Sequence, residues 1–231
     1  KPSSPNYSIP PRQNPMDAGT LHQNTLVIDS HNDSIVAHIR RGHMSLDGKY
    51  LPTERRHHDA VGYLRQYIEP LGQGIQLDIP RMQAGGIDAA FFAVDTTRAW
   101  GNHLLYGLDA LGYFIQEINS HPQDIVIARC VQDINNAKNN GKLAALLAIE
   151  NSNVLEQSLN ILPLLYQLGI RTMTLTHSTR TWAGDGCEVE GNGGLTHFGK
   201  TLIAQMNKLG MLVDISHLNE AGFWDTLACC T

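Results

Sequence analysis

The sequence predicts an α/β fold built around a parallel β-sheet. Two observations predict it: short, continuously apolar runs recur along the chain, and stretches with the 3.6-residue spacing of a helix lie between them. Because these runs are apolar throughout rather than alternating, they are expected to be strands buried on both faces, as in a parallel sheet. Strand, helix and strand in succession then form right-handed βαβ units.

The apolar runs predict five strands and the periodic stretches predict helices between them. The strands are expected at residues 25–31, 87–95, 143–150, 171–177 and 210–217. Helices are expected at 102–121, at 153–169 with Gly169 as a C-terminal stop, and at 194–210.

Two segments fall outside this pattern. Residues 1–25 are rich in proline and polar side chains, which predicts an extended N-terminal arm before a domain at 26–231. A long polar insertion is expected at about 39–80, with a short helix of its own at 60–71. The adjacent His57 and His58 lie in this insertion and are expected to be solvated.

Composition narrows the class of protein. The chain has 231 residues, of which 42% are hydrophobic, so it can bury the core of one globular domain or of a large part of one. A net charge of -5 and scattered Lys and Arg residues give no basic field, so no nucleic-acid partner is expected. No apolar run approaches the roughly 18 to 20 residues of a membrane span. Four cysteines without a CxxC motif predict no disulfide scaffold, and the compartment stays open.

Four of the five predicted strands end in side chains that bind metals: His31 with Asp33, Glu150, His177 and His217. The carboxyl ends of parallel strands open around one crevice, so we expect these five side chains to lie close together. His31 and Asp33 are two residues apart on one face of a strand and can share a zinc or similar divalent ion.

Glu150 ends the most apolar of the runs, where an unpaired carboxylate would be costly. Its two oxygens can hold two metals at the roughly 3.5 to 4 Å spacing of binuclear hydrolytic sites, so we expect it to be a bridging ligand. His217 is then expected to bind the second ion. His177 is expected to be either another ligand or a residue that polarises the substrate.

Other polar residues and a glycine-rich segment lie close to these side chains in the sequence. Asp95 is expected to cap the turn after its strand, whereas Asp29 and Asp214 are expected either to hold a histidine ring or to cap a loop. The glycine-rich residues 183–194 predict a mobile loop over the site, and Arg180–Trp182 before it either contact substrate or pack the loop. No Gly-x-Ser-x-Gly elbow and no plausible cysteine nucleophile occur, which disfavours covalent catalysis.

Six ordered segments resemble the membrane dipeptidase (renal dipeptidase, peptidase M19) family of the amidohydrolase superfamily. They are "VIDSHND", "LDIPRMQAGGIDAAFFAV", "AIEN", "GIRTMTLTHSTRTWAGD", "GLTHFGKTLIAQMNKLGMLVDISHL" and "FWD", and they span about residues 20–227. The resemblance implies a (β/α)8 TIM barrel with two zinc ions that hydrolyses the peptide bond of dipeptides through a metal-bridging hydroxide.

The same resemblance assigns roles to individual residues. It implies that His31 and Asp33 bind one zinc, that Glu150 bridges, that His217 binds the second zinc, and that His177 contacts the substrate. Asn151 and Ser152 stand where the family usually has glycines. The family's remaining strands, which carry a second histidine for the second zinc, an Arg and an Asp, should follow residues 223–227, so the barrel is expected to be incomplete, with about five βα units and an incomplete second site.

Two alternatives to a complete dipeptidase remain open from the sequence. One is a catalytically incomplete remnant, in which open strand edges are covered by a missing segment or by a further copy of the chain, as in a homo-oligomer. The other is an amidohydrolase that acts on another small amide or on a lactone, because related folds host different substrates.

Overall fold

The computed structural model describes residues 17–35, 45–49, 77–97 and 102–230. Residues 1–16 of the predicted arm lie outside this part of the chain. So does most of the predicted insertion, including the helix expected at 60–71 and the pair His57 and His58.

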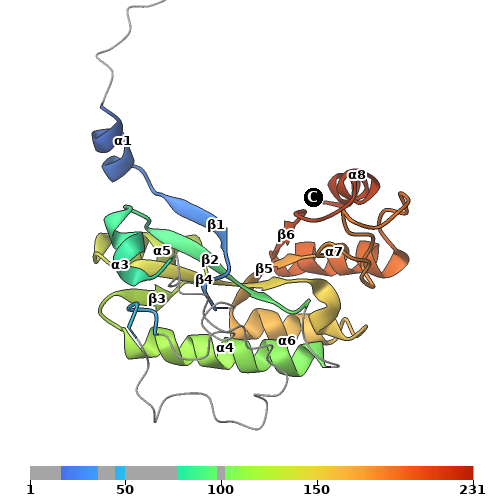
Figure 1. Cartoon of the computed structure of the whole chain (residues 1–231), viewed down its shortest axis with the longest axis horizontal. Coiled ribbons are helices and arrows are strands. Elements are labelled where there is room, and N and C mark those ends of the chain that lie inside the picture. The colour runs from blue at the N-terminus through green and yellow to red at the C-terminus, as the bar shows by residue number, and fades with distance from the viewer. Residues whose placement is uncertain (1–16, 36–44, 50–76, 98–101, 231) are drawn as a thin grey trace, which may run out of the picture.

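The described chain forms one parallel sheet of six strands that curves into a half-barrel (Figure 1). The strands are β1 (Ile28–Asn32), β2 (Ala89–Asp95), β3 (Ile125–Ile127), β4 (Leu143–Glu150), β5 (Ile170–Thr174) and β6 (Leu212–Asp214). Their order is β1-β2-β4-β5-β6, and β3 pairs with the first residues of β4. The predicted parallel sheet is confirmed.

One strand was missed: the sequence predicted five strands, and the structure has a sixth, β3. It has only three residues and pairs with Leu143–Ala145, on the side of β4 that β5 occupies further along. A run this short carries too few residues for periodicity to separate a strand from a loop. Its pairing to β4, rather than its own sequence, makes it a strand.

The centre of the sheet is β4, in which every residue is buried. Alternate residues point to opposite faces: Ala145, Leu147 and Ile149 join the larger hydrophobic core, and Ala144 and Leu146 join a smaller one. The larger core includes residues of α4 (His103–Ser120), and the smaller one includes residues of α5 (Val131–Asn139). By the same alternation, Glu150 stands on the face of the smaller core.

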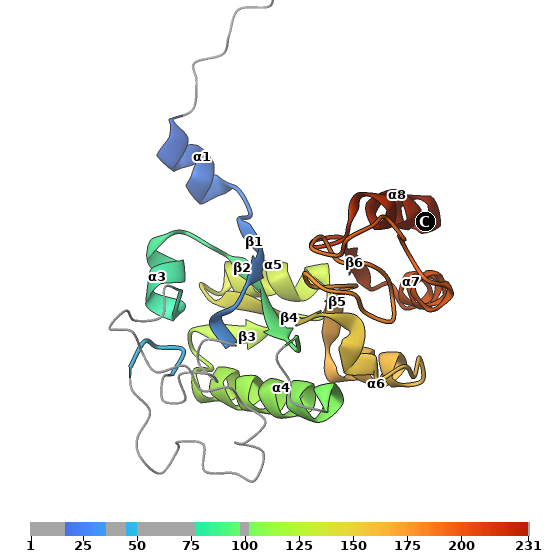
Figure 2. The same cartoon turned by 45° about the vertical axis from the view of Figure 1, so that its right-hand side comes forward.

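Four more helices of the described chain lie against or beside the sheet, as Figures 1 and 2 show from two directions. They are α3 (Ile79–Ala84), α6 (Ile161–Leu168), α7 (His197–Leu209) and α8 (Glu220–Cys229). The helices predicted at 102–121 and 194–210 are confirmed as α4 and α7. Asn102 and Thr196 cap their N-termini by accepting hydrogen bonds from Leu105 N and Gly199 N.

The single helix predicted at 153–169 is wrong in its first half. Residues Ser152–Leu155 form a short 3-10 helix (η3), and the α-helix begins only at Ile161. Pro163 explains the break, because in a continuous helix its ring would clash with the carbonyl of residue 159, whereas in the first turn of α6 it is tolerated. Gly169 ends α6 in a left-handed conformation, as predicted.

The predicted extended arm is also wrong for its last residues, because Ala18–Asn24 form a helix, α1. Asp17 accepts a hydrogen bond from Thr20 N and so caps this helix, although none of its residues is buried. None of the described helices combines the length and hydrophobicity needed to cross a membrane.

Candidate metal centre

The four predicted ligands and His177 meet at the carboxyl edge of the sheet. Strand register explains how: Asp95, Glu150, Thr174 and Asp214 are paired in one row across β2, β4, β5 and β6. His177 and His217 each follow this row by three residues, on the loops after β5 and β6. The prediction that these side chains lie close together is confirmed by their ion-pair distances.

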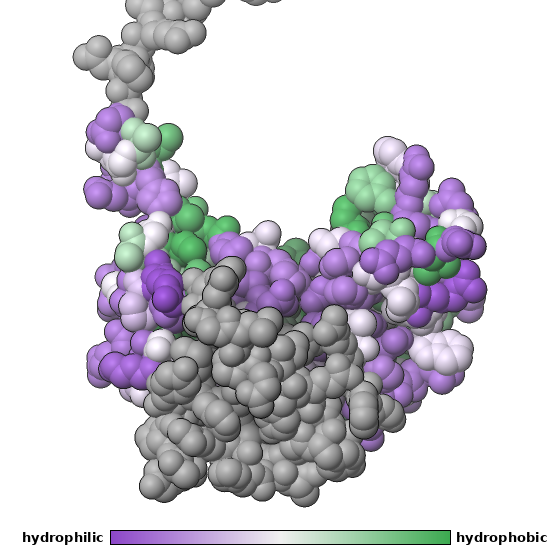
Figure 3. All heavy atoms as spheres, in the orientation of Figure 1, coloured by the Kyte–Doolittle hydropathy of each residue, from purple (hydrophilic) through white to green (hydrophobic). Residues whose placement is uncertain are grey.

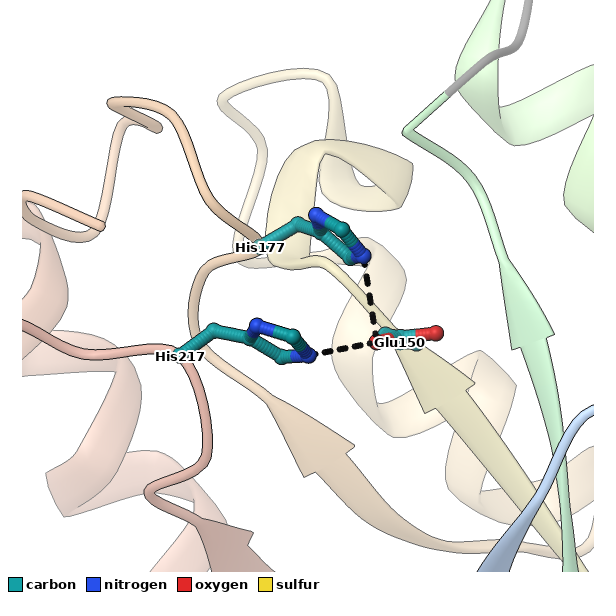
Figure 4. Close-up of side chains that lie close together, drawn as sticks. All are labelled: Glu150, His177 and His217. Carbon is teal, nitrogen blue, oxygen red and sulfur yellow. Dashed lines mark ion pairs between the residues drawn. The ribbon is translucent and has the colours of Figure 1, made fainter. Parts of the chain in front are cut away.

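Glu150 is the centre of the cluster, and its side chain is only 5% exposed. Its Oε2 lies 3.7 Å from His31 Nε2, which in turn is 3.7 Å from Asp33 Oδ1. Its Oε1 lies 3.1 Å from His217 Nε2 and 3.6 Å from His177 Nε2 (Figure 4). The two oxygens of one carboxylate therefore face two different groups of donors.

The donor atoms in each group are spaced as metal ligands are. The atoms of His31, Asp33 and Glu150 lie within 4.8 Å of one another, and so do those of Glu150, His177 and His217. Tetrahedral zinc with ligands at about 2.0–2.1 Å separates neighbouring ligand atoms by roughly 3.3 Å, close to the distances found here. The residue types, imidazole and carboxylate, are also those that zinc prefers.

The electrostatics of the cluster favour added positive charge. Burial and, to a smaller extent, the neighbouring Asp95 carboxylate raise the pKa of Glu150 from 4.5 to about 7 against the opposing effect of His31. The pKa of His31 is also raised, first by its hydrogen bond to Asp33 and then by the charge of Glu150. Both shifts favour a bound proton at the cluster, and a bound cation would supply positive charge in its place.

The aspartates around the cluster hold the ligand residues and the turns beside them. Asp214 Oδ2 lies 3.9 Å from His31 Nδ1 and accepts a hydrogen bond from Thr174 Oγ1, so β6 contacts β1 across the hollow of the half-barrel. Asp29 accepts weakly from His31 N at 3.4 Å. Asp95 Oδ1 accepts from Thr97 N at 2.7 Å, which confirms its predicted capping of the turn.

Backbone contacts join the glycine-rich loop to the segment that carries His217. Cys187 N donates to His217 O at 2.8 Å, and Gly186 forms a bridge with Leu218. Of the two roles predicted for Arg180, the structure shows loop packing, because its guanidinium donates to the carboxylate of Asp185. That contact holds the pKa of Asp185 below its usual value.

The sequence did not predict the backbone conformations of Asn151 and His217 or the bridge formed by Gly186. Asn151, directly after Glu150, has a φ of 82°, and His217 has a φ of 65°, both in a region that side chains rarely adopt. One feature of the sequence pointed to Asn151, because it stands where the resembled family usually has a glycine. Gly186 lies in the glycine-rich segment 183–194, but nothing in the sequence marked its bridge to Leu218, which is 32 positions later.

Residues 16–231 match the model of the membrane dipeptidase family, peptidase family M19. The chain belongs to this family. Among curated members, Dipeptidase 3 of Mus musculus is 35% identical over 160 residues, which cover 66% of this chain and 32% of that protein. Dipeptidase aclJ of Aspergillus oryzae is 30% identical over 158 residues, which cover 63% of this chain and 37% of that protein. The chain thus spans about a third of the length of these two dipeptidases.

Solved structures support the barrel fold of this membrane dipeptidase family member. A metallopeptidase from Rhodobacter sphaeroides, liganded with a phosphinate mimic of the dipeptide L-Ala-D-Ala, has a TM-score of 0.68 at 22% identity. The match covers 89% of this chain and 62% of that one. An amidohydrolase from Pseudomonas aeruginosa gives 0.69 at 21% identity, covering 94% and 53%. The half-barrel seen here is consistent with an incomplete TIM barrel.

Proposed function

We propose that this chain binds two divalent cations, zinc by family resemblance, on the two sides of Glu150 and that it hydrolyses dipeptides. The observation that carries the proposal is the position of the Glu150 carboxylate, whose two oxygens face separate donor groups. Because the chain spans only part of its relatives, the activity of the whole protein rests on family membership and on this geometry together.

The residues divide between the two sites. His31 and Asp33 would hold one cation with Glu150, and His217 would hold the other. Within the described residues the first cation would have three donor atoms, and the second would have those of Glu150 and His217 beside His177, which leaves coordination positions for water or substrate at both, as in catalytic zinc sites. When bound, such a pair of cations supplies Lewis-acid activation of a water molecule and of the scissile carbonyl.

His177 is proposed to contact the substrate rather than to bind metal. Its Nε2 lies 3.6 Å from Glu150 Oε1, whereas that of His217 lies 3.1 Å away, and the two rings stack at 4.3 Å. A neutral imidazole in this position can donate a hydrogen bond to the oxygen that becomes negative during attack on a carbonyl. Asp214, close to the other ring nitrogen of His31, would fix the orientation of that ligand.

A direct assay tests the proposed dipeptidase activity. Zn²⁺-loaded protein is expected to hydrolyse an unmodified dipeptide such as Ala-Ala, and Glu150→Gln is expected to abolish this hydrolysis. An N-acyl amide and a lactone serve as competing substrate classes. Hydrolysis of the lactone alone would contradict the dipeptidase proposal and support another amidohydrolase activity on the same site.

His177→Ala separates the two roles of this histidine. We expect the variant to keep both Zn²⁺ ions and to lose activity by about 10² to 10³-fold in kcat, because one stabilising donor is removed. Metal analysis and dipeptide kinetics on the same sample measure the two quantities. Loss of one Zn²⁺ in this variant would show that His177 is a ligand.

A second candidate, metal binding without turnover, is favoured by the open sheet. In the described chain β1 and β6 are the outer strands and pair with no strand beyond them, and Ile28 and Leu212 on them are exposed. Figure 3 shows hydrophobic surface on both sides of the hollow between these ends. Bound Zn²⁺ without dipeptide hydrolysis would support this candidate, with further chain or a second copy needed to complete the site.

A further inference from the structure

The backbone directly after Glu150 is held in an unfavourable conformation. Asn151 has φ 82° and ψ 111° and is almost completely buried. Side chains adopt positive φ rarely, and such residues persist only where the surrounding structure holds them. Asparagine is among the residues that tolerate it best, but glycine does so without cost. The contacts of Asn151 therefore need to account for its presence.

Asn151 links its own loop to the end of β2. Its Oδ1 accepts a hydrogen bond from Asn153 N, and its Nδ2 donates to Thr97 Oγ1, both at 3.0 Å. Glycine at this position could make neither bond. The side chain thus connects the loop after Glu150 to the loop after Asp95, the two strand ends that are paired in the sheet.

Thr96 holds the peptide groups on both sides of this position. Its backbone N donates to Glu150 O at 3.1 Å, and its Oγ1 donates to Asn151 O at 3.1 Å. Thr96 is fully buried, so these bonds are shielded from water. The chain at Glu150 is consequently fixed at its carbonyl and at the next carbonyl by one neighbouring residue.

Ser152 connects the same loop to β5 on the other side. Its Oγ donates to Leu175 O at 2.6 Å, and both residues are buried. Leu175 lies two residues before His177, so this bond joins the segment that carries Glu150 to the segment that carries His177. Three strand ends are therefore connected by side chains of residues adjacent to the shared carboxylate.

We propose that Thr96, Asn151 and Ser152 form a clamp that positions the Glu150 carboxylate between the two donor groups. The proposal rests on the proposed function, since it assigns the clamp to cation binding. A glutamate has three side-chain torsions, and a ligand shared by two cations must be held in place relative to both. Residues that support metal ligands commonly change metal affinity by about 10 to 100-fold when replaced. The three are positioning residues, and none of them belongs to either donor group.

Asn151→Gly tests the clamp without adding backbone strain. We expect the metal-free variant to unfold at a temperature close to that of the wild type, because glycine adopts a φ of 82° freely. We expect its Zn²⁺ affinity, measured by calorimetric titration of the full chain, to fall by about 10-fold. Ser152→Ala is expected to weaken Zn²⁺ binding as well, and Ser152→Thr, which keeps the hydroxyl, to restore it.

Gln157→Gly is the matched control. Gln157 lies in the same loop at a φ of 67°, and it is exposed. It is expected to leave Zn²⁺ binding unchanged. Unaltered Zn²⁺ affinity in both Asn151→Gly and Ser152→Ala would overturn the proposal, because a merely structural role affects unfolding and not metal affinity.

Hydrogen exchange separates failure of the clamp from failure of the proposed function. In metal-free protein, Asn151→Gly is expected to speed exchange of the Thr96 amide, which donates to Glu150 O, whereas Gln157→Gly leaves it unchanged. Unchanged Thr96 exchange in Asn151→Gly would refute the clamp. A wild-type protein that binds no Zn²⁺ would refute the proposed function, and the exchange rates would still decide whether the clamp exists.

Discussion

Glu150→Gln is expected to abolish Zn²⁺ binding and, in metal-free protein, to raise stability above neutral pH. Burial is the largest of the effects that raise the pKa of Glu150 from 4.5 to about 7. Between these two pH values the Glu150 side chain is therefore protonated in the folded chain and ionised in the unfolded chain. The stability due to this proton is complete below the unfolded pKa and is lost as pH rises through the folded pKa. The shift corresponds to at most about 3 kcal/mol.

The pH dependence supplies the internal control. At pH 8 the metal-free variant should melt above the wild type, because the amide carries no buried charge, and near pH 4 the difference should vanish. Thermal unfolding with a chelator at the two pH values measures this, and Zn²⁺ titration measures binding. A variant that is less stable than the wild type at pH 8 would show that Glu150 is not under electrostatic strain, and retained Zn²⁺ would contradict its role as the shared ligand.

Gly186→Ala is expected to weaken the second cation site and to destabilise the chain. A Cβ at this position would lie 2.2 Å from His177 O and 2.5 Å from Ser178 O, which are backbone atoms that cannot move aside cheaply. Overpacking of this kind costs about 1–3 kcal/mol. Because Gly186 also bridges to Leu218, next to His217, the displacement should reach both histidines.

Cys187→Ala provides the comparison for that variant, because it places alanine at the next position, where the side chain is exposed. Thermal unfolding and Zn²⁺ titration of both variants measure the effect. We expect only Gly186→Ala to lose Zn²⁺ affinity, and to lose it at one of two sites. Equal behaviour of the two variants would show that the loop does not determine where His177 and His217 lie.

The strand ends of the candidate site were predictable from sequence because parallel strands place their carboxyl ends together. His31, Glu150 and His217 each follow an apolar run, and the structure brings their side chains within a few ångströms. Such a rule needs only local sequence and the handedness of βαβ units. Family membership and the incomplete barrel were predictable for a different reason, the six ordered segments that resemble the family.

The features that could not be predicted from the sequence depend mainly on contacts between residues far apart in the chain. β3 is a strand because it pairs with β4, and η3 interrupts the predicted helix before Pro163. The hydrogen bond from Asn151 to Thr97 spans 54 positions. Residue identity alone cannot report such a contact, because Asn and Thr side chains make similar bonds locally in many loops.

The number of Zn²⁺ ions bound per chain tests the central claim, that one carboxylate serves two cation sites, most directly. Metal analysis after dialysis should give two ions for the wild type, one each for His31→Ala and His217→Ala, and none for Glu150→Gln. The single-histidine variants each remove a donor from one group, whereas Glu150 belongs to both groups. One Zn²⁺ retained in Glu150→Gln would contradict the shared carboxylate.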